Sequence, residues 1–345
     1  MSAQSGAPFG HFRKTAPSKG PRSYYWLESW TLTNQRPDVD VGVVTWNTAD
    51  VTPKALRALL DSEQGCRIRL LVRDNASSDG TVEAIRATVP EAEIDAGTRN
   101  LGFGAGMNTI FARSSAPWLL VLNPDAWPSP NAIGRLVEAA ERHPRAAAIA
   151  PRLENADGTL QHSTHPFPSI SVAANVAFRW GRLPPEKADA LMLEGSWAHD
   201  REREVDWAIA ASMLLRHSAL ERIGGFDETF FMYVEDLEWC WRARTLGWEI
   251  WFEPSAVFQH VGNVSGQKAY GDKRRRTFFL NELIFYRRTH GRAAALAWWA
   301  VNLAGSGVRM ASAIGKRDRA QARHWRSYAR DLVAARIDGR RKAPD

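Results

Sequence analysis

Only two of the 345 residues are cysteine, and Cys66 and Cys240 lack the spacing of metal ligands. This argues against a disulfide-stabilised fold and fits a reducing compartment. Long apolar runs are also missing. The apolar stretch 293–303 is interrupted by Asn302 and is shorter than the roughly 20 residues that cross a bilayer. Residues 1–21 show no apolar core, so no signal peptide is visible there.

The composition is that of a globular protein, with 44% apolar and 24% charged residues. Its net charge of +7 is unevenly distributed. Residues 273–345 carry 18 Lys and Arg against five Asp and Glu, whereas residues 1–272 are net acidic. A basic segment after an acidic globule indicates an anionic partner, either nucleic acid or an anionic membrane face. The structural alternative is a helical cap with a charged, solvated surface.

Short apolar runs alternate with helix-like stretches along most of the chain, and this alternation predicts βαβ units and a mostly parallel sheet. We predict strands at 41–45, 68–72, around Ile94, and at 118–122, 146–150, 207–215, 248–252 and 256–260. We predict helices from Pro53, over 81–88, through Arg113, over 131–143 and 235–246, and throughout the chain after Lys273. The segmentation is a disordered leader (1–38), an α/β domain (39–270) with an irregular insertion (152–205), and a basic helical extension (271–345).

The glycine-rich loop 100–108 raises the question of a dinucleotide-binding site. The fingerprint G-x-G-x-x-G requires glycine where this chain has Met107, and it belongs directly after the first strand. The loop lies well downstream of that strand, which argues against a nicotinamide or flavin enzyme.

Two acidic clusters lie more than a hundred residues apart. Asp125 closes an Asn-Pro-Asp motif directly after the strand 118–122, at the edge where open α/β sheets bind their ligands. Glu235 and Asp236 open a Trp-rich helix after a Gly-Gly-Phe-Asp loop. One carboxylate to hold a metal and another to take a proton are what a metal-assisted group transfer needs.

Five motifs, in this order, resemble the inverting family 2 glycosyltransferases of the GT-A fold, and their rhamnosyltransferase-like branch in particular. The motifs are 43–47, Asp74-Asn75 with 78–80, the loop 100–108, Asn123-Pro124-Asp125, and the long stretch 211–242. The resemblance covers about 41–266. It implies an α/β fold of the Rossmann-like GT-A type, a mostly parallel sheet flanked by helices, here followed by the basic helical extension.

The resemblance also implies a donor site. In this family the first strand end receives the nucleotide base, and the residue matched by Asp74 accepts a hydrogen bond from the imide of uracil or thymine, which needs an acceptor. An Asx-turn after the strand, or glycines that serve helix–sheet packing, would be the structural alternatives. We expect the donor to contact Thr45, Asn47, Asp74, Asn75, Asn100, Gly104, Asn108, Asn123 and Arg242.

The same family resemblance implies which residues bind a metal ion and which residue acts as the general base. Asp125 and His260 are the expected ligands of Mg²⁺ or Mn²⁺. Because Asn123 stands where other GT-A enzymes carry the first Asp of Asp-x-Asp, we expect weak metal affinity in the absence of donor. Asp236 matches the general base that deprotonates the acceptor hydroxyl, with Glu235 as the alternative. A purely structural histidine at 260 remains open.

The expected function is the transfer of a sugar with inversion at its anomeric carbon. The preferred donor is dTDP-rhamnose, which would supply L-rhamnose, and another dTDP- or UDP-sugar is the alternative. The acceptor would be a hydroxyl of a lipid-linked or polysaccharide substrate in cell-envelope glycan synthesis. We expect a cytoplasmic enzyme whose extension binds the anionic inner face of the cell membrane, with no nucleic acid partner. The sequence leaves open whether it is a monomer or a homodimer.

Two functions from other classes are the alternatives. A sugar nucleotidyltransferase would need a Lys- or Arg-rich loop after the first strand, and residues 46–50 supply none. A non-catalytic saccharide-binding protein would have no use for Asp236 after a Gly-Gly-Phe-Asp loop.

Overall fold

The computed structural model describes residues 37–178, 197–262 and 273–341. Nearly all of the predicted leader, 1–38, therefore lies outside the described residues, as does the stretch 179–196 of the predicted insertion.

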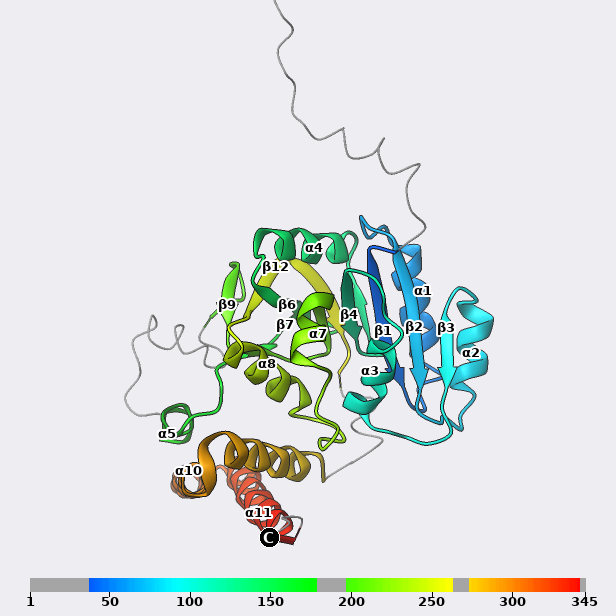
Figure 1. Cartoon of the computed structure of the whole chain (residues 1–345). Coiled ribbons are helices and arrows are strands. Elements are labelled where there is room, and N and C mark those ends of the chain that lie inside the picture. The colour runs from blue at the N-terminus through cyan, green and yellow to red at the C-terminus, as the bar shows by residue number, and fades with distance from the viewer. Residues whose placement is uncertain (1–36, 179–196, 263–272, 342–345) are drawn as a thin grey trace, which may run out of the picture. The chain divides into compact units, whose positions relative to one another are not determined.

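A ten-stranded sheet in the order β3-β2-β1-β4-β11-β6-β12-β5 lies at the centre of the fold (Figure 1). Its first half is parallel: β1 pairs with β2 and β4, and β2 pairs with β3. Helices connect these strands, as the alternation in the sequence predicts. The elements are β1 (Val39–Thr45), α1 (Thr52–Asp61), β2 (Ile68–Asp74), α2 (Thr81–Thr88), β3 (Glu93–Ala96), α3 (Phe103–Phe111) and β4 (Trp118–Leu122).

The second half of the sheet is mixed. β11 runs antiparallel between β4 and β6, whereas β12 is parallel to β6 and antiparallel to β5 and β9. β7 extends β6 as a short hairpin. The elements are β5 (Ala126–Pro128), α4 (Ala132–Arg142), β6 (Ala146–Glu154), β7 (Leu160–Gln161), β9 (Arg203–Val205), β11 (Ser212–Arg216), α7 (His217–Ile223), α8 (Glu235–Thr245) and β12 (Glu249–His260).

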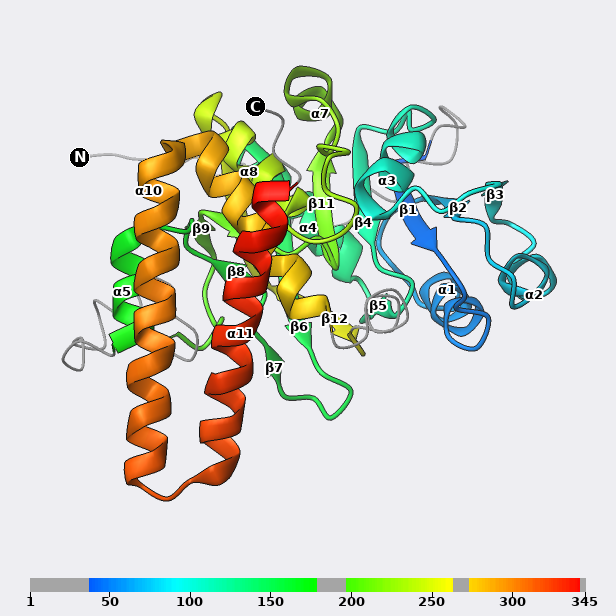
Figure 2. The same ribbon diagram turned by 90° about the horizontal axis from the view of Figure 1, so that it is seen from below.

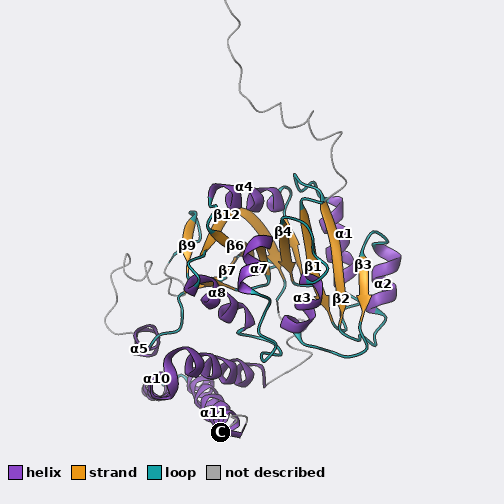
Figure 3. Cartoon of the chain, viewed as in Figure 1, coloured by secondary structure: helices purple, strands orange, loops and turns teal. Residues whose placement is uncertain are grey.

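Helices cover both faces of the sheet, because successive strand residues point to opposite sides. In β4, Leu120 and Leu122 pack into the core under α1, α2 and α4, whereas Leu119 and Val121 pack into the core under α3, α7 and α8. Figure 3 shows the sheet between these helices. The α/β fold predicted from the sequence is confirmed, but its sheet is mixed and not mostly parallel, because β11 enters antiparallel between β4 and β6.

Two strand predictions need correction. The single strand expected at 207–215 is interrupted, because the Ala210 N–H bonds to Asp236 instead of a neighbouring strand. Its first part, β10 (Trp207–Ala208), pairs with β8 (Thr164–His165) in a separate two-stranded sheet. Conversely, the two strands expected at 248–252 and 256–260 form one strand, β12, with a register shift near Pro254, which has no N–H to donate.

The C-terminal extension is an antiparallel helix pair, α10 (Arg274–Gly315) and α11 (Arg319–Arg341), with α5 (Ile170–Phe178) against α10 (Figure 2). The helix expected after Lys273 continues through Asn302, whose side-chain amide donates to the Trp298 carbonyl, but it contains one break. The break lies at Gly291, whose φ of 87° is left-handed. Among the described residues, no helix combines the length and the apolar character that crossing a bilayer requires.

Candidate active site

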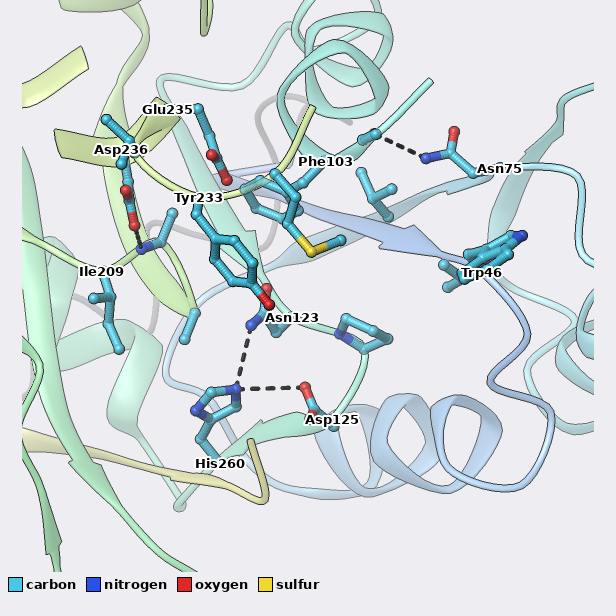
Figure 4. A pocket seen from close by; sticks show the side chains of 18 of the residues that line it. Trp46, Asn75, Phe103, Asn123, Asp125, Ile209, Tyr233, Glu235, Asp236 and His260 are labelled. Carbon is cyan, nitrogen blue, oxygen red and sulfur yellow. Dashed lines mark hydrogen bonds and ion pairs between the residues drawn. The ribbon is translucent and has the colours of Figure 1, made fainter. Parts of the chain in front are cut away.

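A pocket of about 240 Å³ lies at the carboxyl ends of β1 and β4, where open α/β sheets bind ligands. Part of its wall is apolar, and Phe278 from α10 belongs to it. Figure 4 shows Asn123, Asp125 and His260 converging in one part of the pocket, with Glu235 and Asp236 in another. The residues predicted for the site that line it are Thr45, Asn75, Asn100, Asn123, Asp125, Glu235, Asp236 and His260.

Strand pairing brings Asp125 and His260 together. β5 follows the Asn-Pro-Asp turn directly, and its pairing with β12 sets Ala126 opposite His260. The Val261 N–H donates to the Asp125 carbonyl at 3.1 Å and fixes this register. As a result His260 Nε2 lies 3.4 Å from Asp125 Oδ1 and 3.2 Å from the Asn123 amide nitrogen. Both Asp125 and His260 are buried.

This pair fits a divalent cation. Neighbouring ligands of an octahedral ion with bonds of about 2.1 Å lie about 3 Å apart, close to the observed separation of Nε2 and Oδ1. No group of three or more His, Cys, Asp or Glu side chains in the described part of the chain is arranged to hold a metal ion. A cation at Asp125 and His260 would therefore need further ligands from water or substrate.

Glu235 and Asp236 begin α8 and differ in their hydrogen bonds. The Asp236 carboxylate accepts the Ala210 N–H at 3.0 Å through one oxygen and the Leu237 N–H at 2.8 Å through the other. Glu235 is 4% exposed, and its Oε2 accepts no hydrogen bond from the described residues. Asp236 is only partly buried.

These surroundings separate the protonation states of the two acids. Burial raises the pKa of Glu235 well above its ordinary value, and the neighbouring Asp236 charge raises it further. Burial also raises the pKa of Asp236, but the N–H groups of Ala210 and Leu237 oppose that shift by stabilising the carboxylate. When the pair loses its first proton, the negative charge therefore resides mainly on Asp236 and the remaining proton on Glu235.

A strained turn precedes this pair. Tyr233 and Val234 have φ angles of 72° and 77°, and a β-branched residue such as valine rarely adopts that conformation. Asn281 on α10 is buried, and its amide nitrogen donates to the carbonyls of Met232 and Tyr233, both at 3.0 Å. The C-terminal extension thus holds the turn that aims Glu235 and Asp236 into the pocket.

Comparison with known proteins agrees with this geometry. The family model described as "Glycosyl transferase family 2" matches residues 40–195. An N-acetylglucosaminyl-diphospho-decaprenol L-rhamnosyltransferase of Mycobacterium tuberculosis is 31% identical over 212 residues, which are 58% of this chain and 69% of that protein. The chain belongs to glycosyltransferase family 2. The resemblance predicted from the sequence motifs, including its rhamnosyltransferase-like character, is confirmed.

Two further comparisons concern more distant proteins. A hexosyltransferase of low-salt glycan biosynthesis from Haloferax volcanii is 29% identical over 150 residues, 43% of this chain and 42% of that protein. A solved mannosyltransferase structure from Pyrobaculum calidifontis, in complex with GDP-Man and Mn²⁺, superposes with a TM-score of 0.56 at 17% identity. It covers 92% of this chain and 93% of that one, and this likeness shows the GT-A fold.

In this glycosyltransferase two residues of the first two motifs, Asn47 and Asp74, lie outside the pocket lining. Asp74 is 1% exposed and does not line the pocket. Its carboxylate accepts the Thr45 hydroxyl at 2.9 Å and the Ser77 N–H at 2.8 Å, so it stabilises the turn after β2, as the structural alternative supposed. Asn47 likewise accepts the Ser78 N–H and lies outside the pocket lining.

Asn75, the residue that follows Asp74, does line the pocket. Its amide nitrogen donates to the Gly102 carbonyl at 2.8 Å, and its Oδ1 accepts no hydrogen bond from the described residues. Asn75 and Trp46 therefore line the pocket at these strand ends, whereas Asp74 does not.

Three other expected donor contacts instead shape the loop before α8. Asn108 accepts the Phe226 N–H at 2.8 Å and donates to the Phe226 carbonyl at 2.9 Å. The Arg242 guanidinium binds the carbonyls of residues 223 and 225 and forms an ion pair with Glu238 at 2.8 Å. A side chain at Gly104 would have its Cβ only 3.1 Å from that of Phe226, so this glycine permits close packing. None of the three lines the pocket.

Asn281 was not a candidate from the sequence, and we predict a measurable role for it. Each of its two hydrogen bonds contributes about 1 kcal/mol, so Asn281→Ala should accelerate amide exchange across residues 232–238 by roughly thirtyfold. Hydrogen-exchange mass spectrometry measures this. Asn302→Ala is the matched control, because Asn302 lies on the same helix and bonds to Trp298 within it. Equal exchange in both variants would contradict a tether at Asn281.

Proposed function

We propose that this glycosyltransferase moves a sugar from a nucleotide diphosphate donor to an acceptor hydroxyl with inversion at the anomeric carbon. The observation that carries the proposal is that a cation-competent pair, Asp125 with His260, and an acidic pair, Glu235 with Asp236, open into one pocket. A single in-line displacement needs both kinds of group around the reacting carbon. We further propose that residues 39–270 form the catalytic domain and 271–345 an extension of it.

Asp125 and His260 would hold Mn²⁺ or Mg²⁺. When bound there together with donor, such an ion would neutralise charge that develops on the leaving diphosphate. Asn123 keeps its amide within 3.2 Å of His260 but supplies no negative charge. The imidazole ligand favours Mn²⁺ over Mg²⁺, which prefers oxygen.

Asp236 would act as the base. The acceptor oxygen bonds to the anomeric carbon from the face opposite the diphosphate, the bond from that carbon to the diphosphate oxygen breaks, and the acceptor proton passes to Asp236. Glu235 would keep its own proton during this step, because its burial disfavours a second charge beside Asp236.

For the donor we propose dTDP-rhamnose, with other dTDP- and UDP-sugars as the alternatives. Support comes from the Mycobacterium tuberculosis relative, which is named as an L-rhamnosyltransferase acting on N-acetylglucosaminyl-diphospho-decaprenol. For the acceptor we propose a lipid-linked saccharide of cell-envelope glycan synthesis. The apolar part of the pocket wall, which includes Trp207, Met232 and Phe278, supports an acceptor with apolar surface.

The base assignment predicts unequal effects of two isosteric substitutions. Asp236→Asn should lower kcat by about a hundredfold or more, whereas Glu235→Gln should lower it much less, because Glu235 keeps its proton. In the wild type, the rate should rise with pH as Asp236 loses its proton, with a midpoint above the ordinary aspartate pKa of about 3.9. Steady-state kinetics across pH checks both statements, and a larger loss in Glu235→Gln would exchange the two roles.

The donor and metal assignments predict a ligand-dependent thermal shift. Because a ligand that binds only the folded protein stabilises it, dTDP-rhamnose with Mn²⁺ should raise Tm more than UDP-sugars do. Asp125→Ala should abolish the Mn²⁺-dependent part of the shift and keep the part due to nucleotide alone. A lack of response to every nucleotide sugar would contradict the proposed donor class.

We also propose that the extension holds the enzyme at the cytoplasmic face of the membrane. The end of α10 and the start of α11 present exposed basic residues beside exposed Val308 and Ile314, and this combination binds anionic bilayer surfaces. The basic residues are Lys316, Arg317, Arg319 and Arg323.

This surface predicts binding that depends on lipid charge. The full chain should float with vesicles that contain anionic phospholipid and not with neutral ones. Glutamine at positions 316, 319 and 323 should weaken flotation strongly, since each basic residue near the surface contributes about 1 kcal/mol. The control removes the same charge at exposed Lys54, Arg86 and Arg222. An equal loss in both triple variants would contradict a specific surface.

A further inference from the structure

His260 makes a hydrogen bond on the side of its ring that faces away from Asp125. Its Nδ1 lies 2.6 Å from the side-chain carbonyl oxygen of Gln161, the last residue of β7. Its Nε2 points to Asn123 and Asp125. The partner of one ring nitrogen decides which nitrogen carries the proton, and only the other can offer a lone pair to a cation.

The orientation of the Gln161 amide is set by a chain of hydrogen bonds in the hairpin between β6 and β7. The chain starts at Asp157, whose pKa is held below its ordinary value by hydrogen bonds from Thr159, so it is an acceptor at neutral pH. The Thr159 hydroxyl donates to Asp157 at 2.6 Å and therefore accepts the Asn155 amide N–H at 2.9 Å.

The remaining links follow from these donor and acceptor roles. With its nitrogen directed at Thr159, Asn155 presents its carbonyl oxygen to Gln161, whose amide nitrogen donates to it at 3.0 Å. That nitrogen also lies 3.5 Å from the His260 backbone carbonyl, a second acceptor. The Gln161 carbonyl oxygen is thus left facing His260 Nδ1, and only a protonated Nδ1 can donate to it.

We infer that Gln161 is a positioning residue that keeps the proton of His260 on Nδ1 and the lone pair on Nε2, directed at the space beside Asp125. This inference rests on the metal role proposed for Asp125 and His260. An imidazole in the other tautomer would present an N–H to the cation and could not bind it. Asn123 agrees with the inferred tautomer, because its amide nitrogen is a donor 3.2 Å from Nε2.

The backbone makes this support rigid. The hairpin closes through the Asn155 N–H to the Thr159 carbonyl at 2.8 Å, with Gly158 in a left-handed conformation. Pairing sets Gln161 opposite Leu153 of β6, and Leu153 in turn opposite Phe258 of β12. Gln161 is therefore held at a fixed distance from the end of β12 that carries His260.

The first test reads the tautomer in the metal-free protein. Nitrogen-15 NMR of the histidine rings distinguishes Nδ1–H from Nε2–H, and His260→Ala identifies the resonance among the nine histidines. In the wild type we expect Nδ1–H. In Gln161→Met, which keeps the side-chain volume but removes the acceptor, the population should move toward Nε2–H. Gln259→Met is the matched control, because it makes the same change beside His260 on the same strand.

A second variant separates the tautomer from general packing. Gln161→Glu keeps an acceptor opposite Nδ1 but cannot donate to Asn155, so the Nδ1–H form should be retained. An Nε2–H wild type, or a tautomer that is the same in Gln161→Met as in the wild type, would overturn the inference whatever the metal does.

Metal affinity provides the independent readout. With the nucleoside diphosphate present, Gln161→Met should bind Mn²⁺ about tenfold or more weakly by electron paramagnetic resonance titration, while Gln161→Glu and Gln259→Met stay near the wild type. An affinity of Gln161→Met within twofold of the wild type, with His260→Ala strongly impaired, would overturn the inference. If His260→Ala itself binds Mn²⁺ normally, the proposed metal role fails, and the tautomer measurement still decides the role of Gln161.

Discussion

The position of the acidic pair depends on two consecutive residues in the left-handed conformation, Tyr233 and Val234. Such a turn is unfavourable by itself and persists only where its surroundings hold it. Asn281 holds it from α10 through two carbonyls, and α8 continues it through the bond from the Glu238 N–H to the Val234 carbonyl at 2.8 Å. The helix that carries the acidic pair, α8, therefore begins where α10 holds the turn that precedes it.

The loop before this turn is held just as firmly. Asn108 bonds to both backbone groups of Phe226, and Arg242 binds two carbonyls near the end of α7. At Gly102, any Cβ would come within 2.2 Å of the Phe231 carbonyl oxygen, so only glycine permits this approach. Residues that the family resemblance assigns to the donor thus act on the acidic pair through the backbone that precedes it.

The cation-competent pair has a separate support. Asp125 is fixed by the pairing of β5 with β12, and His260 by the hairpin between β6 and β7. That hairpin is the first part of the segment 152–205, which the sequence marks only as an irregular insertion. The two halves of the site are therefore stabilised by different additions to the sheet, so a substitution in one support should leave the geometry of the other unchanged.

Sequence patterns predicted the features that depend on neighbouring residues. The runs that become β1, β2 and β4 are short and apolar, and both acidic clusters follow clear strand or helix signals. The contribution of Asn281 could not be predicted, because it reaches back almost fifty residues to the Met232 carbonyl and an isolated asparagine carries no signal. Asp74 and Asn75 show most clearly what sequence patterns cannot predict. Neighbouring residues at a strand end point in different directions, and no sequence pattern tells which one faces the pocket.

The number of Lys and Arg residues in the extension overstates the positive charge that is available to a partner. Its excess of Lys and Arg predicts an anionic partner, yet part of that charge is used within the fold. Arg275 pairs with Asp331 and Arg276 with Asp338, which joins α10 to α11, and Arg288 pairs with Asp227 of the loop before α8. These arginines hold the extension together and fix it to the catalytic domain. The exposed basic residues near the turn between α10 and α11 are not among these pairs, so under the proposed membrane role the geometry of that turn, rather than the total charge, decides how the enzyme would lie on a bilayer.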